Sequence, residues 1–161
     1  MLKKLLSGIL ILVVSPLVIS CSLNKDNSSI EDILQPANEA LGIEIPWPHY
    51  LPEGYTMKNV MVSDNTSATL FISNDDKNSI TLEIVWKQTG VIPYKIDVNR
   101  PTLEINGLLG QLLEDEKGEN GVIWNWYPER YEPGLIVLKL FVPAEITVND
   151  LKMIAESISW D

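Results

Sequence analysis

The chain has 161 residues with 22 acidic and 12 basic side chains, a net charge of −10, and a single cysteine. This acidic balance excludes nucleic acid as an expected partner, because neutralising phosphates requires a basic surface. One cysteine excludes an intramolecular disulfide, so the folded part must rely on its packed core.

The first twenty residues have the pattern of a secretory signal peptide. Lys3 and Lys4 form a short basic start, and a nearly unbroken apolar run follows from Leu5 to Ile19. A membrane span is the alternative, but it wants roughly 20 apolar residues, and this run is shorter and contains Pro16. We therefore expect residues 1–20 to be removed on export. Their removal takes away two of the 12 basic side chains and no acidic ones, leaving a net charge of −12.

The only cysteine lies where this apolar run ends. Val18, Ile19, Ser20 and Cys21 resemble the lipobox of bacterial lipoprotein precursors: an aliphatic, a variable and a small residue, then cysteine. The resemblance implies that the sulfur of Cys21 receives a diacylglycerol and that Cys21 becomes the first residue of the mature protein. An incidental cysteine in an ordinary signal peptide is the alternative. Because two or more acyl chains anchor a protein stably, we expect an extracytoplasmic protein held to the bacterial cell membrane through Cys21.

A tether and a helix follow the cysteine. Residues 21–29 are mostly small and polar and predict a flexible linker. From Ile30 to Leu41 apolar residues recur at helical spacing, with Ser29 as a candidate N-cap and Gly42 as a candidate stop. Pro36 either interrupts this helix or restarts it. Three prolines and three aromatic residues within 45–56 then predict an ordered connector that is not helical.

The rest of the chain reads as strands followed by a helix. In the segment 79–87 the apolar side chains alternate, which is typical of a half-buried strand, and Asn106-Gly107 is a hairpin signal. Thr147 and Asp150 form a capping-box pattern, and an apolar stripe extends from there to Ile158. The predicted strands are 55–63, 68–73, 79–87, 102–105, 109–114, 122–127 and 135–142.

These elements predict one α+β domain over residues 30–161. We expect a single curved antiparallel β-sheet of about six to seven strands, packed by the C-terminal helix and the short N-terminal helix, and preceded by the signal peptide.

Four segments of this domain resemble a family of bacterial exported domains of unknown function, the DUF4367 type. The resemblance covers about residues 38–160, and its motifs are structural, so it implies a fold and transfers no catalytic residue. A looser similarity, at the level of fold, is to the curved half-barrel of lipoprotein carriers and related periplasmic regulators. The segments are Tyr50-Leu51-Pro52-Glu53-Gly54-Tyr55, Ile105-Asn106-Gly107 with Gly110, Ile123-Trp124-Asn125-Trp126, and Leu151-Lys152-Met153-Ile154-Ala155-Glu156-Ser157-Ile158.

Candidate chemistry is sparse. His49 is the only histidine and no GxSxG signature is present, so a catalytic triad is not expected. One histidine and an acylated cysteine cannot complete a four-ligand zinc site, and the acidic runs at 75–76 and 114–119 lack the spacing of a calcium loop. We expect no catalytic residue, no metal and no cofactor.

The candidate ligand-binding residues are aromatic. Trp86, Trp124, Trp126 and Tyr127 lie in predicted strands, and Trp124 and Trp126 share a face, which lines either a core or a binding concavity. Two functions stay open: a non-catalytic binding or interaction module for an unknown protein, or a carrier or chaperone for a lipid or acyl chain on the concave face. An enzyme is less favoured. A carrier requires an apolar cavity of several hundred Å³ between sheet and helix.

Overall fold

The computed structural model describes residues 29–63, 66–74, 78–87, 93–114, 120–128 and 134–160. The predicted signal peptide, Cys21 and nearly all of the tether lie outside these residues, as do the acidic residues of 75–76 and 115–119. None of the helices among the residues described is long and apolar enough to cross a membrane.

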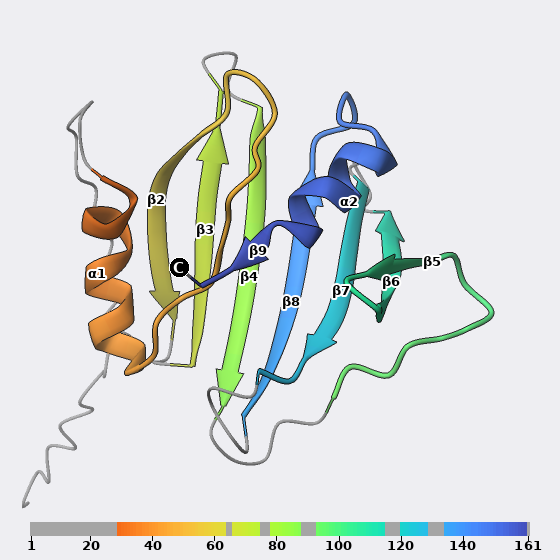
Figure 1. Ribbon diagram of the computed structural model, residues 1–161, viewed down its shortest axis with the longest axis horizontal. Helices are drawn as coiled ribbons and strands as arrows, with labels where there is room; N and C mark the ends of the chain where they lie inside the picture. Colours follow the sequence, from red (N-terminus) through yellow and green to blue (C-terminus); the bar gives the residue numbers. More distant parts are fainter. Residues whose placement is uncertain are drawn as a thin grey trace, which may run out of the picture.

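Within that range the fold is a seven-stranded antiparallel sheet with two helices on one face, as the sequence predicts (Figure 1). The strand order is β2-β3-β4-β8-β7-β6-β5, and β1 pairs with β9 in a separate two-stranded sheet. The elements are α1 (Ile30–Leu41), β1 (Trp47–Pro48), β2 (Thr56–Ser63), β3 (Ser67–Ser73), β4 (Ser79–Lys87), β5 (Thr102–Ile105), β6 (Leu108–Glu114), β7 (Asn120–Trp126), β8 (Leu135–Val142), α2 (Val148–Glu156) and β9 (Ile158–Ser159).

Strand β8 joins the two halves of the sheet. Strands β2 to β4 and strands β5 to β7 each follow one another as antiparallel neighbours, and β8 returns to lie between β4 and β7. Leu140 of β8 is opposite Leu82 on one side and Val122 on the other. All three side chains are fully buried, so the centre of the core lies along this strand.

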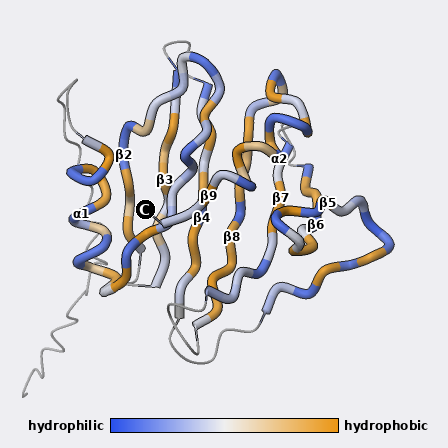
Figure 2. The backbone as a smooth tube through the Cα atoms, in the orientation of Figure 1, coloured by the Kyte–Doolittle hydropathy of each residue, from blue (hydrophilic) through white to orange (hydrophobic). Residues whose placement is uncertain are grey.

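Alternation sets the apolar face of the sheet. The predicted apolar positions of β4 are buried, from Ile80 at 0% exposure to Trp86 at 5%. Figure 2 shows the apolar positions recurring along the central strands. The helices, the connector between α1 and β2, and β9 cover this face, and the prediction of an amphipathic sheet packed by two helices is confirmed (Figure 1).

The two helices begin with the predicted caps. The Ser29 hydroxyl accepts the backbone N–H of Asp32 at 3.2 Å, and the Asp32 carboxylate accepts the N–H of Ser29. Helix α1 passes through Pro36 and ends at Gly42, whose φ of 66° is left-handed. In α2, the Thr147 hydroxyl accepts the N–H of Asp150, also at 3.2 Å.

The C-terminal segment differs from the sequence prediction in one respect. The apolar stripe placed Ile158 on the last helix, but α2 ends at Glu156, and Ile158 pairs with Pro48 in the β9–β1 ladder. The connector is hydrogen-bonded to the residue that ends α2, because the N–H of His49 donates to the carbonyl of Ser157 at 3.2 Å. Ile158 is nevertheless buried, so its apolar character was read correctly and its element was not.

The opposite face carries the segment that leads into β5. Two side-chain amides hold this segment: Asn125 exchanges two hydrogen bonds of 2.8 Å with the backbone of Tyr94, and Gln111 accepts the N–H of Asp97 and donates to the carbonyl of Pro101. Gln111 is 1% exposed, and these bonds satisfy its amide group.

Candidate functional site

The structure does not bring the four predicted aromatic residues to one site. Trp86 and Trp124 are core residues with 5% and 2% exposure, and Trp126 is half-buried at the end of β7. Trp86 and Trp126 flank Ile136 from the two neighbouring strands. Tyr127 lies beyond the end of β7 and is 58% exposed.

The space between α2 and the sheet is nearly filled. A cavity of about 60 Å³ remains there, well below the roughly 300 Å³ at which ligand pockets begin. Its walls are Ile105, Asn106, Leu108, Trp124, Trp126, Leu138, Ala155 and Ile158. Within the described residues, Trp124 and Trp126 both border this small space, and Trp126 also stacks on Trp160, beyond the end of α2.

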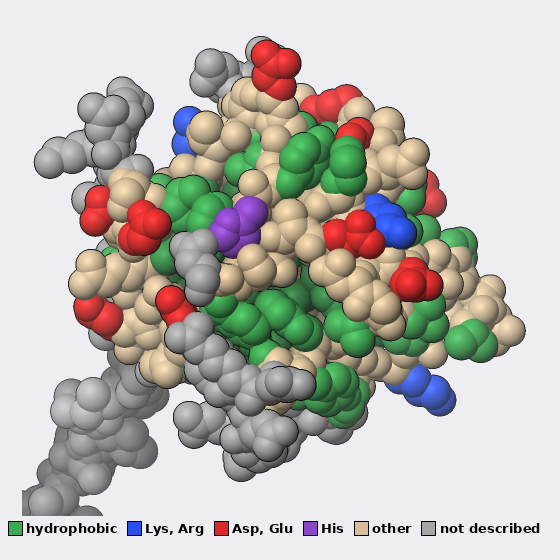
Figure 3. Space-filling model, viewed as in Figure 1, with side chains coloured by type: hydrophobic (Ala, Val, Ile, Leu, Met, Phe, Trp, Pro, Cys, Tyr) green, Lys and Arg blue, Asp and Glu red, His purple; other side chains and the backbone are tan. Residues whose placement is uncertain are grey.

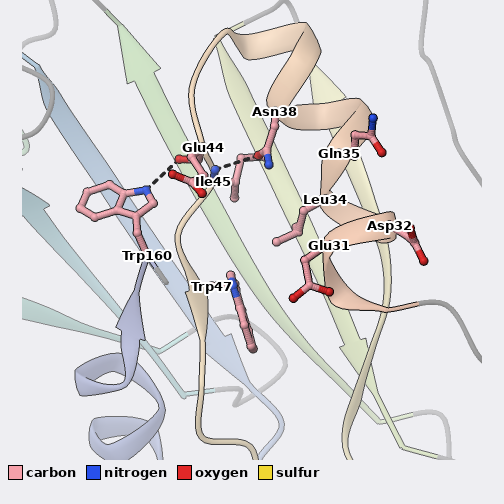
Figure 4. Close-up of a pocket in the computed structure, with 9 residues that line it drawn as sticks. All are labelled: Glu31, Asp32, Leu34, Gln35, Asn38, Glu44, Ile45, Trp47 and Trp160. Atoms are coloured by element: carbon pink, nitrogen blue, oxygen red, sulfur yellow. Dashed lines mark hydrogen bonds between the residues drawn. The ribbon is translucent and has the colours of Figure 1, made fainter.

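A larger hollow lies beside α1. It has a volume of about 300 Å³ and is formed by one side of α1, the first part of the connector and the indole near the C-terminus (Figure 4). We call it the α1 groove. Its lining residues are Glu31, Asp32, Leu34, Gln35, Asn38, Glu44, Ile45, Trp47 and Trp160.

Local hydrogen bonds fix the walls of the α1 groove. The left-handed Gly42 ends α1, and the connector then runs back along the helix (Figure 1). The N–H of Ile45 donates to Oδ1 of Asn38 at 2.8 Å, which ties the connector to the helix. The indole N–H of Trp160 donates to the carbonyl of Glu44, also at 2.8 Å, so the connector is held from both sides (Figure 4).

Two indoles supply the apolar surface. The ring of Trp47 lies 4.0 Å from the ring of His49, and the ring of Trp160 stacks on that of Trp126 with centroids 4.3 Å apart. These contacts restrict both indoles before any ligand arrives. The single histidine lies beside apolar surface in the space-filling view, and acidic side chains are spread over this face of the molecule, its α1 side included (Figure 3).

The charge of the groove is negative. Glu31 and Leu34 are on the side of α1 that faces Trp47, whereas Asp32 and Gln35 turn away from the connector (Figure 4). The pKa of Glu31 is lowered, first by a hydrogen bond from its own backbone N–H and second by the Ser29 hydroxyl. Glu31 is therefore ionised at neutral pH, and a carboxylate in the first helical turn also suits the helix dipole.

The sequence did not predict this site. The connector was identified as aromatic and ordered, but Glu31, Glu44 and Trp160 were not singled out. Trp160 offered one signal of the site: it follows Ile158, the last residue of the apolar stripe, so this large apolar side chain must pack somewhere other than on that stripe. In the described ranges, no three His, Cys, Asp or Glu side chains gather closely enough to hold a metal ion.

The sheet, α2 and most of the connector match a known family model. Residues 45–158 match the Domain of unknown function (DUF4367). The chain belongs to the DUF4367 family. The family resemblance read from the sequence is thereby confirmed, over a range that begins seven residues later than expected, at 45 instead of 38. The comparisons found no match to this chain among curated proteins and none among solved structures.

The boundary of the match passes through the α1 groove. The DUF4367 domain contributes Ile45 and Trp47, while α1, Glu44 and Trp160 lie outside the matched residues. The groove is therefore formed where segments flanking the family domain pack against it.

Proposed function

We propose that this DUF4367 protein is a lipoprotein anchored to the outer side of the bacterial cell membrane, where it acts as a non-catalytic binding module. The α1 groove is the binding site. The lipobox-like sequence ending at Cys21 supports the anchor, and the groove, being the larger of the two hollows described, supports the binding role.

The contrast between the two hollows carries this proposal. The space between α2 and the sheet is about 60 Å³, and the α1 groove is about 300 Å³. A carrier of acyl chains needs the larger volume under α2, whereas a binding module needs a preformed surface hollow. The bonds from Ile45 to Asn38 and from Trp160 to Glu44 hold the groove walls in place, which lowers the entropic cost of binding.

The side chains of the groove fit binding better than catalysis. The described lining offers carboxylates, amides, aliphatic groups and indoles, and it contains no hydroxyl, thiol or imidazole that could serve as a nucleophile and its base.

The groove also lies close to the proposed anchor. Eight residues separate Cys21 from Ile30, and the nine Cα–Cα steps between the two span at most about 30 Å when the chain is fully extended. Glu31 in the first turn of α1 would then lie within roughly that distance of the bilayer surface. A partner bound there would be another component of the cell envelope.

The anchor is tested in the bacterium that makes the protein. We expect the wild-type chain in the membrane fraction, with residues 1–20 absent and a diacylglycerol mass on Cys21, and we expect Cys21→Ser to lose that modification. Recovery of the wild type in the cytosol with an unmodified thiol would refute the anchored role.

The binding site is tested by photo-crosslinking in the same cells. A benzophenone amino acid at Gln35, on the rim of the groove, should give a discrete adduct. The same residue at Thr69, on the opposite face of the sheet, is the control and should not give that adduct. Equal adducts from both positions would refute the proposal that the α1 groove is the binding site. An acyl chain retained by the purified protein in native mass spectrometry would favour the carrier instead.

A further inference from the structure

The α1 groove combines a hydrocarbon-like surface with negative charge. Leu34 and the ring of Trp47 face each other across it, and Glu31 lies between the helix and that ring (Figure 4). Within the described part of the chain, no lysine or arginine forms an ion pair with Glu31. The carboxylate is exposed and accepts from its own backbone N–H and the Ser29 hydroxyl, and its remaining lone pairs can accept from a cation brought by a ligand.

Two backbone groups of the groove are already bonded. The N–H of Ile45 donates to Asn38, and the carbonyl of Glu44 accepts from Trp160. These two groups are not open to an added peptide strand, as the groups of an open sheet edge would be. Recognition by a side chain that enters the groove does not depend on them.

Size and charge select the kind of side chain. A volume of about 300 Å³ is at the lower limit of ligand pockets, which suits one long side chain and not a folded domain or an acyl chain. A guanidinium group stacks on indole faces and forms paired hydrogen bonds to a carboxylate, and its aliphatic stem packs on leucine. The excess of acidic residues over basic ones in the chain would also attract a basic segment.

We propose that the α1 groove binds an arginine side chain of a basic segment in a partner protein, with Glu31 pairing the guanidinium and Trp47 lying beside it. This inference rests on the proposed function and adds the chemistry of the partner. The ligand is an extended peptide, and the groove selects it by the guanidinium group of a single arginine.

The test uses the full-length chain purified in detergent and two synthetic nine-residue peptides of glycine and serine. One peptide carries a central arginine and the other a central citrulline, which keeps the shape and removes the charge. Binding is followed by the indole N–H signals of Trp47 and Trp160 in NMR spectra, assigned with Trp→Phe variants. We expect the arginine peptide to shift the Trp47 signal more than the signal of Trp160, which lies across the connector from Glu31 (Figure 4), and the citrulline peptide to shift neither at the same concentration.

Matched variants on α1 separate a specific pair from general charge. Glu31→Gln should weaken binding of the arginine peptide by up to about fivefold, the upper end for an ion pair with an exposed carboxylate. Glu39→Gln is the control, because Glu39 is on the same helix, binds Gln35 and does not line the groove, and it should change the affinity by less than about twofold. Both glutamate side chains are exposed, so both variants should fold and keep the wild-type circular dichroism spectrum.

Three results would overturn the inference: equal binding of the citrulline peptide, equal losses in Glu31→Gln and Glu39→Gln, or the same indole shifts produced by bilayer discs of phosphatidylethanolamine without any peptide. The last result would assign the groove to an amine headgroup. If the arginine peptide fails while the crosslinker at Gln35 still gives its adduct, the binding module stands and only the arginine ligand is lost. Failure of both removes both proposals.

Discussion

The two helices follow the same local rules and build different surfaces. Each begins with a hydroxyl N-cap that accepts a backbone N–H at 3.2 Å, with an aspartate three residues later. Each buries three apolar side chains: Leu34, Ala37 and Leu41 in α1, and Leu151, Ile154 and Ala155 in α2.

Their neighbours make the difference. Helix α2 contacts β5, β7 and β8 and leaves about 60 Å³ beneath it, whereas α1 contacts the edge strand β2 and leaves about 300 Å³ between itself and the connector. Helix α2 lies across two interior strands and the edge strand β5, so the sheet closes the space beneath it, whereas α1 packs beside the edge strand β2 and has one side facing the groove. Capping and periodicity therefore define where a helix forms, and the surface it meets defines whether a groove remains.

The largest expected effect is in the core beneath α2. Trp124→Ala removes a ring that is 2% exposed, and we expect it to lower the free energy of unfolding by about 3–5 kcal/mol. Tyr127→Ala is the control, since that ring is 58% exposed and its loss should change stability by no more than about 0.5 kcal/mol. Chemical denaturation followed by circular dichroism measures both. An unchanged unfolding free energy for Trp124→Ala, with loss of a bound ligand, would make this ring a ligand contact instead.

A leucine pair compares the two helices directly. Leu151 of α2 is 0% exposed and Leu34 of α1 is 4% exposed. Leucine to alanine changes in cores cost about 2–5 kcal/mol, and the cost rises with the cavity that is left behind. We expect the loss of unfolding free energy to lie in the upper part of this range for Leu151→Ala and in the lower part for Leu34→Ala. Leu34 borders the α1 groove, so water can enter the space that its side chain leaves. Equal losses would mean that α1 is packed as closely as α2.

The next largest loss of stability is expected from removing the hydrogen bond between Asn38 of α1 and Ile45 of the connector. Asn38→Ala leaves the N–H of Ile45 without its acceptor, and Ile45 is 1% exposed, so we expect a loss of about 1–3 kcal/mol. Hydrogen exchange should show faster exchange at the Ile45 amide. Gln35→Ala, on an exposed position of the same helix, should leave that amide protected. Unchanged exchange in Asn38→Ala would show that the connector is held by other contacts.

Local patterns predicted much of the fold. Alternation in β4 identified the buried face, and Asn106-Gly107 predicted the β5–β6 turn, where both residues have positive φ, 47° and 79°. That pair of left-handed residues matches the tight hairpin turn for which the dipeptide is known. Both capping residues were also predicted, because each cap depends on residues only three positions apart.

The site depends on contacts that no local pattern encodes. The α1 groove joins a helix, a stretch of connector and Trp160, which lies 116 residues beyond the carbonyl of Glu44 that it binds. The same limit applies to the tryptophan face of β7: alternation places Trp124 and Trp126 together but does not reveal which part of the C-terminal segment, from Ala155 to Trp160, lies against them. Whether that face is core or pocket is decided by the docking of a distant segment.

The smallest expected effect compares the caps themselves. Ser29→Ala and Thr147→Ala each remove a hydroxyl acceptor, which costs about 1 kcal/mol at a helix N-terminus. We expect the loss from Thr147→Ala in global unfolding, because the first turn of α2 continues directly into Leu151 of the core. Ser29→Ala should appear mainly as local fraying, with faster exchange of the Asp32 amide at the end of α1 that carries Glu31. If Ser29→Ala lowered global stability as much as Thr147→Ala, the first turn of α1 would have to unfold together with the core, and the groove would be as rigid as the interior under α2.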